Sequence, residues 1–486
     1  MSELPGVRQI ATEVREGRTT AVAQLDACLS RIEAGDKSVN GFMEVQSEAA
    51  RTQAEQVDAI IARGDDPGPL AGVPIAIKDN IVMQGRKTTC GSRILENYIS
   101  PFESTATERL VKAGAVLVGT TRCDEFAMGS STEHCAHGLV RNPWNHEHVP
   151  GGSSGGSAAV VAQGMVPAAL GSDTGGSIRQ PAAYCGITGL KPSYGRVSRW
   201  GLVAFGSSLD CIGPLTRDVA DSAAIMNVIA GPDSHDSTSV DTPAPDYLQN
   251  LDERKPLVVG LPRQHLHERN HPAVVAALDE AKARLEAQGA TFIDVDLKMT
   301  DHGIATYYVV ATAEASSNLA RFDGIRYGRR AEQRAGESLE DLYARSRGEG
   351  FGPEVRRRIM LGTYVLSAGY YDAYYKKALQ ARRVIHDEYK QVFQTCDVLL
   401  GPTTAEPAFK IGSIADPLTM YLSDRYTVGA NIAGIPAISI PAGLAEVEGA
   451  SMPIGLQLQA PFLGEQALLQ AANQLQQSSD HHLASP

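Results

Sequence analysis

Several features that would point to a secreted or membrane protein are missing from this sequence. Its seven cysteines are scattered along 486 residues, and none stands in a C-x-x-C pair. An odd, dispersed set predicts reduced thiols and a cytoplasmic protein. The first residues lack the charged and apolar regions of a signal peptide, and no apolar run reaches membrane-spanning length.

The sequence also lacks a net positive charge and a phosphate-binding loop. The chain has 44 Lys and Arg against 56 Asp and Glu, a net charge of −12. Nucleic acids bind largely through basic side chains, so the chain is not expected to hold one by itself without a local basic patch. A P-loop needs Lys and then Ser or Thr after its last glycine, whereas Ala158 follows Ser157 here. The 43% of hydrophobic residues suits a globular protein with a large core.

Strand and helix patterns alternate over most of the chain, which predicts an α/β fold. Residues 4–64 read as helices, with caps at Thr19 or Thr20 and at Ser47, and Thr105 with Glu108 reads as a capping box. We expect one domain over residues 1–486, with residues 1–66 as a helical collar packed on it. The expected strands are 73–77, 115–118, 166–170, 257–261, 292–297, 398–400, 437–440 and 454–458. The other expected helices are 178–184, 272–288, 354–395, with possible breaks at Gly362 and Gly369, and 465–477.

The stretch 151–179 carries two Gly/Ser clusters, G-G-S-S-G-G-S and G-S-D-T-G-G-S, on either side of an apolar segment. A plain linker would not alternate with such apolar residues, so two tight backbone arcs meeting over one site are the better interpretation. Ser177 lies between a strand-like run and a helix start, as a nucleophile on a tight turn does. The N–H groups of Thr174, Gly175, Gly176 and Ser177 would then be free to bind an oxyanion.

A catalytic serine needs a base, and no histidine lies near this stretch. Lys78 ends the apolar run 73–77. Burial at the end of a strand would lower the pKa of this lysine toward neutrality and let it act as the base. An ordinary surface lysine at a strand end is the alternative.

Together these residues resemble the amidase signature family. The family motifs run from Leu70 to about Pro214 and include C-G-I-T-G-L-K-P from Cys185. The resemblance implies a mixed central β-sheet covered by helices on both faces and a Ser–cis-Ser–Lys triad. In it Lys78 is the base, Ser153 the bridging serine and Ser177 the nucleophile, while the role of Ser154 is open.

Longer motifs resemble one branch of that family, found in aspartyl/glutamyl-tRNA amidotransferases. They include Y-Y-V-V-A-T-A-E-A-S-S-N-L from Tyr307, F-G-P-E-V-R-R-R-I-M-L-G-T-Y from Phe351 and M-Y-L-S-D-R-Y-T-V from Met420. The resemblance implies that free glutamine is the substrate. It places Arg357 on the α-carboxylate and Asp424 on the α-ammonium, with Tyr308 as a wall or donor. A solvated or partner-facing basic helix face is the alternative for Arg357.

Further site residues follow from position in the chain. The segment D-E-F-A-M-G-S ends in Gly129 and Ser130 and comes after the strand 115–118. Ligands gather at such strand ends in open α/β sheets, so we expect both residues to line the substrate site.

The same resemblance implies that this chain binds no cofactor. A partner B subunit would use ATP with Mg²⁺ to transamidate misacylated Glu-tRNA(Gln), Asp-tRNA(Asn) or both, and a small C subunit would complete a heterotrimer. The chain would supply ammonia and would touch tRNA only through B, with no membrane involved. Two alternatives stay open: a stand-alone amidase with a more apolar pocket, and a non-catalytic scaffold that keeps the fold for assembly.

Two groups of residues have sequence patterns similar to those of metal sites. His267-Glu268-Arg269-Asn270-His271 matches H-E-x-x-H, but it lies between Pro262 and Pro272, before the expected helix begins. Cys123, His134, Cys135 and His137 fit no common zinc spacing. We therefore expect no metal.

Overall fold

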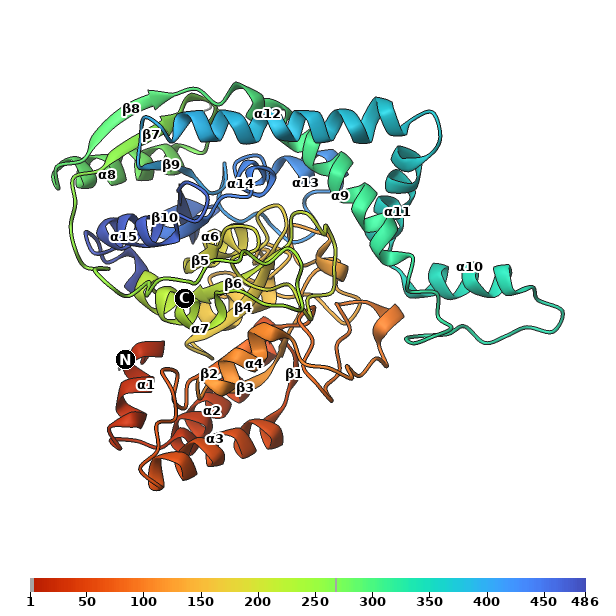
Figure 1. The fold of residues 1–486 in the computed structure, drawn as a ribbon, viewed down its shortest axis with the longest axis horizontal. Coiled ribbons are helices and arrows are strands. Elements are labelled where there is room, and N and C mark those ends of the chain that lie inside the picture. The colour runs from red at the N-terminus through yellow and green to blue at the C-terminus, as the bar shows by residue number, and fades with distance from the viewer. Residues whose placement is uncertain (1–3, 267–268) are drawn as a thin grey trace.

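One eleven-stranded sheet runs through the computed structural model, which describes residues 4–266 and 269–486 (Figure 1). The strand order is β1-β3-β2-β4-β6-β5-β10-β11-β9-β7-β8. The strands are β1 (Phe42–Val45), β2 (Pro74–Lys78), β3 (Val116–Thr121), β4 (Ala168–Asp173), β5 (Thr188–Lys191), β6 (Cys211–Thr216), β7 (Val258–Pro262), β8 (Thr291–Val295), β9 (Val398–Pro402), β10 (Ala437–Val447) and β11 (Ala450–Gln459).

The sheet is mixed, as expected. β2 lies parallel to both β3 and β4, and β7 lies parallel to β8 and β9. The central pairings from β4 through β6, β5, β10 and β11 to β9 are antiparallel. Since β2 and β4 are parallel neighbours, their carboxyl ends meet at the same edge, and this edge carries the two Gly/Ser arcs.

Helices cover both faces of the sheet, and strand residues alternate between two cores. On β9, Val398 and Leu400 face one core and Leu399 faces the other. The helices are α1 (Val7–Arg15), α2 (Ala21–Val39), α3 (Ser47–Ala62), α4 (Thr105–Lys112), α5 (Gly155–Ala162), α6 (Arg179–Cys185), α7 (Val219–Ile229), α8 (Pro272–Glu286), α9 (Gly303–Leu319), α10 (Leu339–Gly350), α11 (Pro353–Leu366), α12 (Lys377–Val392), α13 (Pro417–Leu422), α14 (Val428–Ala433) and α15 (Glu465–Gln476).

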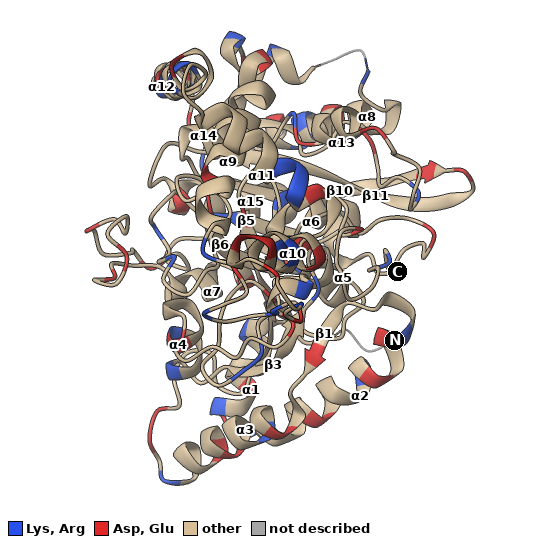
Figure 2. Cartoon of the chain, turned by 90° about the vertical axis from the view of Figure 1, so that its right-hand side faces the viewer, with Lys and Arg blue, Asp and Glu red and all other residues tan. Residues whose placement is uncertain are grey.

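The N-terminal helices follow the expected pattern with some corrections. Thr20 caps α2 by accepting a hydrogen bond from Ala23 N, and Leu25, Cys28 and Ile32 form its buried stripe. Figure 2 shows the charged residues of α2 and α3 along the outside of the molecule. Ser47 is the first residue of α3 and not its cap. The short strand β1, which pairs with β3, interrupts a stretch that we expected to be entirely helical.

Three further expectations can be compared with the structure. The β7–α8–β8 unit is parallel, as a βαβ unit predicts. Ser104, and not Thr105, caps α4, because its hydroxyl accepts from Thr107 N. The expected helix 354–395 breaks near Gly369, which has a φ of +89°, but Gly362 lies inside α11. A Cβ at Gly362 would overlap the carbonyl oxygen of Thr312, so glycine here permits close contact between α9 and α11.

The helices of the described residues were also compared with the requirements of a membrane span. None of them combines the length and the apolar character needed to cross a bilayer.

Candidate active site

Lys78 lies at the carboxyl end of β2 and is completely buried. Its Nζ donates hydrogen bonds to Ser153 Oγ at 2.7 Å, to Ser154 Oγ at 2.9 Å and to Ser172 Oγ at 2.9 Å. The residue is therefore not an exposed lysine at a strand end. It joins β2 to the first Gly/Ser arc and to β4.

Burial lowers the pKa of Lys78 from 10.5 to about 8, although nearby acidic groups, including Asp124 and Asp173, act in the opposite direction. Its three shortest hydrogen bonds go to hydroxyl groups and not to a carboxylate, so no direct ion pair with a described residue offsets the loss of solvation of the ammonium form. A lysine with this pKa is partly neutral near neutral pH and can accept a proton.

The two arcs are in direct contact. Ser154 N donates to Ser177 O at 3.1 Å, which brings the residue after Ser153 against Ser177. The peptide bond between Gly152 and Ser153 is cis. Ser153 and Ser154 are fully buried, whereas Ser177 retains 9% exposure. Ser177 is thus the serine of the three that a small substrate can reach, while Ser153 contacts Lys78.

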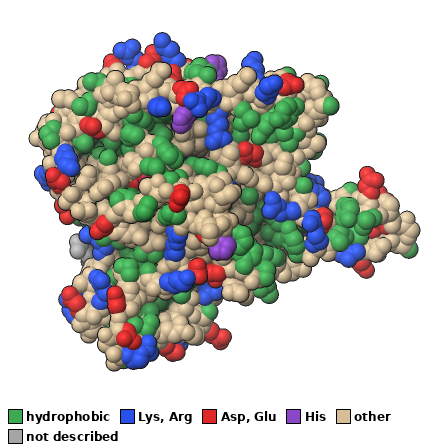
Figure 3. Space-filling model, in the orientation of Figure 1, with side chains coloured by type: hydrophobic (Ala, Val, Ile, Leu, Met, Phe, Trp, Pro, Cys, Tyr) green, Lys and Arg blue, Asp and Glu red, His purple; other side chains and the backbone are tan. Residues whose placement is uncertain are grey.

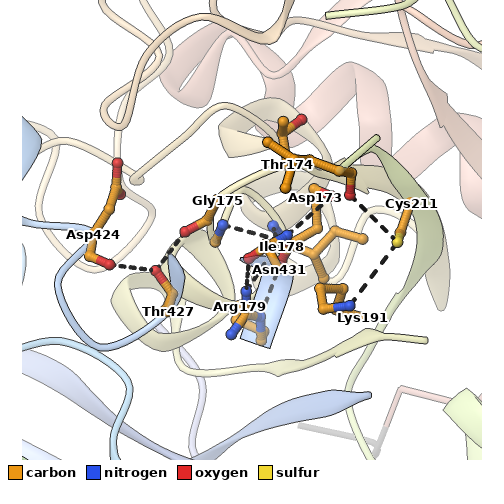
Figure 4. Close-up of polar contacts among 12 residues, drawn as sticks. Asp173, Thr174, Gly175, Ile178, Arg179, Lys191, Cys211, Asp424, Thr427 and Asn431 are labelled. Carbon is orange, nitrogen blue, oxygen red and sulfur yellow. Dashed lines mark hydrogen bonds and ion pairs between the residues drawn. The ribbon is translucent and has the colours of Figure 1, made fainter. Parts of the chain in front are cut away.

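Asp173 holds the backbone turn that carries Ser177. Its carboxylate accepts hydrogen bonds from Gly176 N at 2.9 Å and Ile178 N at 3.1 Å, and it pairs with Arg179 through two bonds of 3.1 Å (Figure 4). Burial alone would raise the pKa of Asp173, but Arg179 lowers it to about 2. Asn431 on α14 donates to the same carboxylate at 2.8 Å.

This arrangement corrects one part of the expected oxyanion site. The Gly176 N–H is occupied by Asp173 and is not free. Among the described residues, the N–H groups of Thr174, Gly175 and Ser177 have no such partner, so they are the remaining candidate donors.

The turn that carries Ser177 is also bound by Thr427, and its positions 175 and 176 require glycine. Thr427 Oγ1 donates to Gly175 O at 2.6 Å and to Asp424 O at 3.0 Å, which ties the turn to the segment before α14 (Figure 4). A Cβ at Gly175 would lie 2.6 Å from the ring of Tyr307, and Gly176 has a φ of +139°.

Asp424, Ser130 and Tyr308 come together, although they are far apart in the sequence. Ser130 Oγ donates to both carboxylate oxygens of Asp424 at 3.0 Å, and Tyr308 OH donates to Oδ2 at 3.3 Å. Burial raises the pKa of Asp424 to about 7, against the lowering effects of these hydrogen bonds and of the charge of Arg358. Gly129, the residue before Ser130, packs against the side chain of Asp124, where a Cβ would not fit. This close packing helps to hold the backbone that carries Ser130.

Two neighbouring arginines, Arg357 and Arg358, lie in different environments. The side chain of Arg357 is 44% exposed and forms an ion pair with Glu354. Arg358 is 3% exposed, and its guanidinium lies 5.2 Å from the ring centre of Tyr308 and 5.3 Å from that of Tyr421. Arg358, which the sequence reasoning passed over, is therefore the arginine beside the Tyr308–Asp424 group.

Arg358 is held by Glu354 and lies beside two stacked tyrosine rings. Its Nε donates to Glu354 Oε1 at 2.8 Å, and Tyr421 OH donates to the same oxygen at 2.9 Å. The rings of Tyr308 and Tyr421 are stacked at 3.9 Å. Nε gives the only hydrogen bond of Arg358 to a described residue, so its two terminal amino groups have no acceptor in residues 4–266 and 269–486. Helical spacing offers a sequence signal for choosing Arg358 over Arg357. The buried side of α11 is the stripe of Val355, Arg358, Gly362 and Val365, and Arg357 lies outside it.

The candidate metal residues do not form a site in the part of the chain that the structure describes. In residues 4–266 and 269–486, no three His, Cys, Asp or Glu side chains are grouped to hold a metal ion. His267 and Glu268 of the H-E-x-x-H match lie outside the described residues. His271 caps α8, with its Nδ1 accepting from Ala273 N, so it precedes the helix.

Comparison with known proteins gives consistent similarities. The family model described as Amidase matches residues 23–469. The chain is 55% identical over 469 residues to the A subunit of glutamyl-tRNA(Gln) amidotransferase from Synechococcus sp. (strain RCC307), covering 96% of each chain. A crystal structure of the A subunit of glutamyl-tRNA(Gln) amidotransferase from Thermotoga maritima is 41% identical, with 93% of each chain covered and a TM-score of 0.76.

A third similarity concerns an enzyme with another substrate. The structure of 6-aminohexanoate cyclic dimer hydrolase with its substrate is 27% identical and has a TM-score of 0.85, with 100% of this chain and 99% of that chain covered. The backbone fold is thus shared by an amidotransferase subunit and a cyclic dimer hydrolase, and sequence identity separates the two better than shape does.

Proposed function

The chain belongs to the amidase family, and from this premise we propose that it is the glutamine-hydrolysing subunit of a tRNA-dependent amidotransferase. The observation that carries the proposal is 55% identity over 96% of the chain to a subunit of that name. It is supported by the hydrogen bond from Lys78 to Ser153 and by the backbone hydrogen bond that joins Ser154 to Ser177. In this role the chain releases ammonia from glutamine for a synthetic reaction elsewhere in the complex.

The reaction begins at Ser177. Its Oγ attacks the side-chain amide carbon of glutamine, while its proton passes through Ser153 Oγ to the neutral Nζ of Lys78. Protonated Lys78 then returns a proton through Ser153 to the amide nitrogen, so that the C–N bond breaks and ammonia leaves. Water repeats the same proton transfers on the acyl-enzyme and releases glutamate.

Backbone N–H groups stabilise the charge that develops in this reaction. The N–H groups of Thr174, Gly175 and Ser177 are the proposed donors to the tetrahedral oxyanion. Asp173 keeps the turn in shape because it binds the N–H groups on either side of Ser177. The turn is thus preorganised before the substrate arrives.

Recognition of free glutamine needs an anion and a cation at fixed positions. Asp424 is the proposed partner of the α-ammonium, with Ser130 and Tyr308 holding its carboxylate. For the α-carboxylate we assign Arg358 in place of Arg357. Arg358 is buried beside Tyr308, and its two terminal amino groups have no acceptor among the described residues. A planar guanidinium suits a carboxylate through two parallel hydrogen bonds.

The remaining steps of amide transfer fall to other subunits. The sequence has no P-loop and a net charge of −12, which does not favour ATP or tRNA binding by this chain. A B subunit is proposed to bind misacylated tRNA and ATP with Mg²⁺, and a small C subunit to join B to this chain. Ammonia is then transferred within the complex, since in water it would be protonated and diluted.

A stand-alone amidase is the second candidate, and the similarity in shape to 6-aminohexanoate cyclic dimer hydrolase favours it. The two functions differ in the need for a charged pocket. An enzyme for simple amides would gain nothing from a buried guanidinium and carboxylate at its substrate site.

The test is to measure glutamine hydrolysis by the chain alone, then with the B and C subunits, and then with ATP and misacylated tRNA added. Hydrolysis is expected to rise at each step, since binding of the acceptor favours the competent glutaminase site. A Ser177→Ala complex is the control for background hydrolysis. Equal turnover in all three conditions would identify an independent hydrolase and overturn the proposal.

A further inference from the structure

The helical hairpin formed by α11, the π-helical turn Tyr371–Lys376 and α12 exposes an unusual number of aromatic side chains. Tyr364, Tyr370, Tyr371 and Tyr374 are each 41–47% exposed, and Met360 is 73% exposed. In residues 366–377, all of which the structure describes, no side chain is buried. Such tyrosines contribute nothing to the core, so their apolar rings need another explanation.

These rings form one continuous patch, which we call the tyrosine patch and define as Met360, Leu361, Tyr364, Tyr370 and Tyr374. The ring centres of Tyr364 and Tyr370 lie 4.2 Å apart, and that of Tyr374 lies 6.1 Å from Tyr364 and 6.0 Å from Tyr370. Met360 and Leu361 stand four and three residues before Tyr364, on the same face of α11. Figure 3 shows hydrophobic side chains gathered at the upper right, where Figure 1 places α11 and the start of α12.

The charge around the patch differs from that of the whole protein. Residues 353–392 contain eight Lys and Arg against four Asp and Glu, a net charge of +4 in a chain whose net charge is −12. Arg358 and Glu354 are a buried pair on the other side of α11, so seven basic and three acidic residues remain and the net charge is unchanged. Lys376 and Lys377 lie directly beside the tyrosines. Tyrosine, methionine and a cationic rim form the composition found at protein interfaces, and the positive rim favours a partner with acidic side chains.

The position of the patch connects it to the candidate active site. The buried stripe of α11 carries Arg358 beside Tyr308, and the opposite face of the same helix carries Met360 and Tyr364. A protein that binds the outer face therefore contacts the helix that holds the proposed carboxylate anchor. Binding there can stabilise the position of Arg358 without touching the substrate.

We infer that the tyrosine patch is the docking surface for the ammonia-accepting part of the complex, a protein whose contact face has aliphatic side chains at its centre and carboxylates around them. The inference rests on the proposed function, which supplies the partner. Docking on α11 makes glutamine binding depend on assembly, because the same helix serves both.

The experiment compares Tyr364→Asp and Tyr374→Asp with Ile99→Asp, a control at a residue that is 59% exposed and outside the patch. Affinity for the co-expressed B and C subunits is measured by calorimetry, and glutamine hydrolysis by each isolated chain is measured beside it. The patch variants should bind at least about 30-fold more weakly, since buried interface tyrosines often contribute this much. Ile99→Asp should bind like the wild type, and all three should keep the basal hydrolysis of the wild-type chain.

A charge variant adds a second readout. Lys377→Glu should weaken binding most at low salt, as expected for a cationic rim. Unchanged affinity in both tyrosine variants, while the wild type binds B and C, would overturn the docking surface and leave the proposed function intact. Loss of self-association in these variants without loss of B and C binding would mean that the patch joins two copies of this chain. A wild-type chain that hydrolyses no glutamine even with B, C, ATP and misacylated tRNA present would instead refute the proposed function.

Discussion

Glutamine hydrolysis should accelerate steeply between pH 6 and pH 8, because two buried groups must lose a proton before the reaction begins. Lys78, with a pKa of about 8, must be neutral to accept the proton of Ser177. Asp424, with a pKa of about 7, must be ionised to pair with the α-ammonium of glutamine. Both requirements act in the same direction, since raising the pH neutralises the lysine and charges the carboxyl group.

The size of the effect follows from the two pKa values. The neutral fraction of Lys78 is about 1% at pH 6 and about 50% at pH 8, a rise of about 50-fold. The ionised fraction of Asp424 rises from about 9% to about 91%, a further factor of about 10. We therefore expect kcat/KM for glutamine to increase about 500-fold over this range, with a slope approaching about 2 in a plot of log kcat/KM against pH below pH 7.

The assay compares glutamine with glutaramate, which is glutamine without its α-amino group. Glutaramate makes no ion pair with Asp424, so its kcat/KM should follow Lys78 alone, with a slope of about 1 and a rise of about 50-fold. Identical slopes for the two substrates would remove Asp424 as the ammonium site. Profiles that are flat from pH 6 to pH 8 for both substrates would refute the neutral lysine base.

Further outcomes can be checked with single variants. Ser177→Ala should abolish glutaminase activity while glutamine still binds by calorimetry, and mass spectrometry of the wild type should find the acyl adduct on Ser177; an adduct on another serine would refute the assignment. Lys78→Arg should be nearly as inactive as Lys78→Ala in the same assay, because arginine cannot give up its proton; substantial activity would make the lysine only an electrostatic support. Arg358→Lys should raise KM for glutamine roughly tenfold or more, whereas Arg357→Lys should change it little, and the reverse result would restore the choice made from the sequence. Gly362→Ala should cost about 2 kcal/mol of stability in a thermal melt, because its Cβ would overlap the backbone of α9, and an unchanged Tm would show that the contact can relax.

Local sequence patterns were sufficient for much of the fold. The helical spacing of Val22, Leu25, Leu29 and Ile32 predicted α2, in which Leu25 and Ile32 are buried. The strand and helix periods around Pro272 predicted the parallel β7–α8–β8 unit. Errors arose where the deciding contact was distant in sequence. Gly362 suggested a break, but its role is set by α9, which lies beside it only in the folded chain.

For the candidate site, the sequence by itself determined the chemistry, because the Gly/Ser arcs and the lysine at the end of a strand are local features that limit what the backbone can do. Only the tertiary structure decided which groups act together. It buried Lys78 beside Ser153, occupied the Gly176 N–H with Asp173, and turned Arg358 rather than Arg357 toward Tyr308. These outcomes depend on burial and on distances between segments remote in the chain, and neither quantity is encoded in any one stretch of sequence.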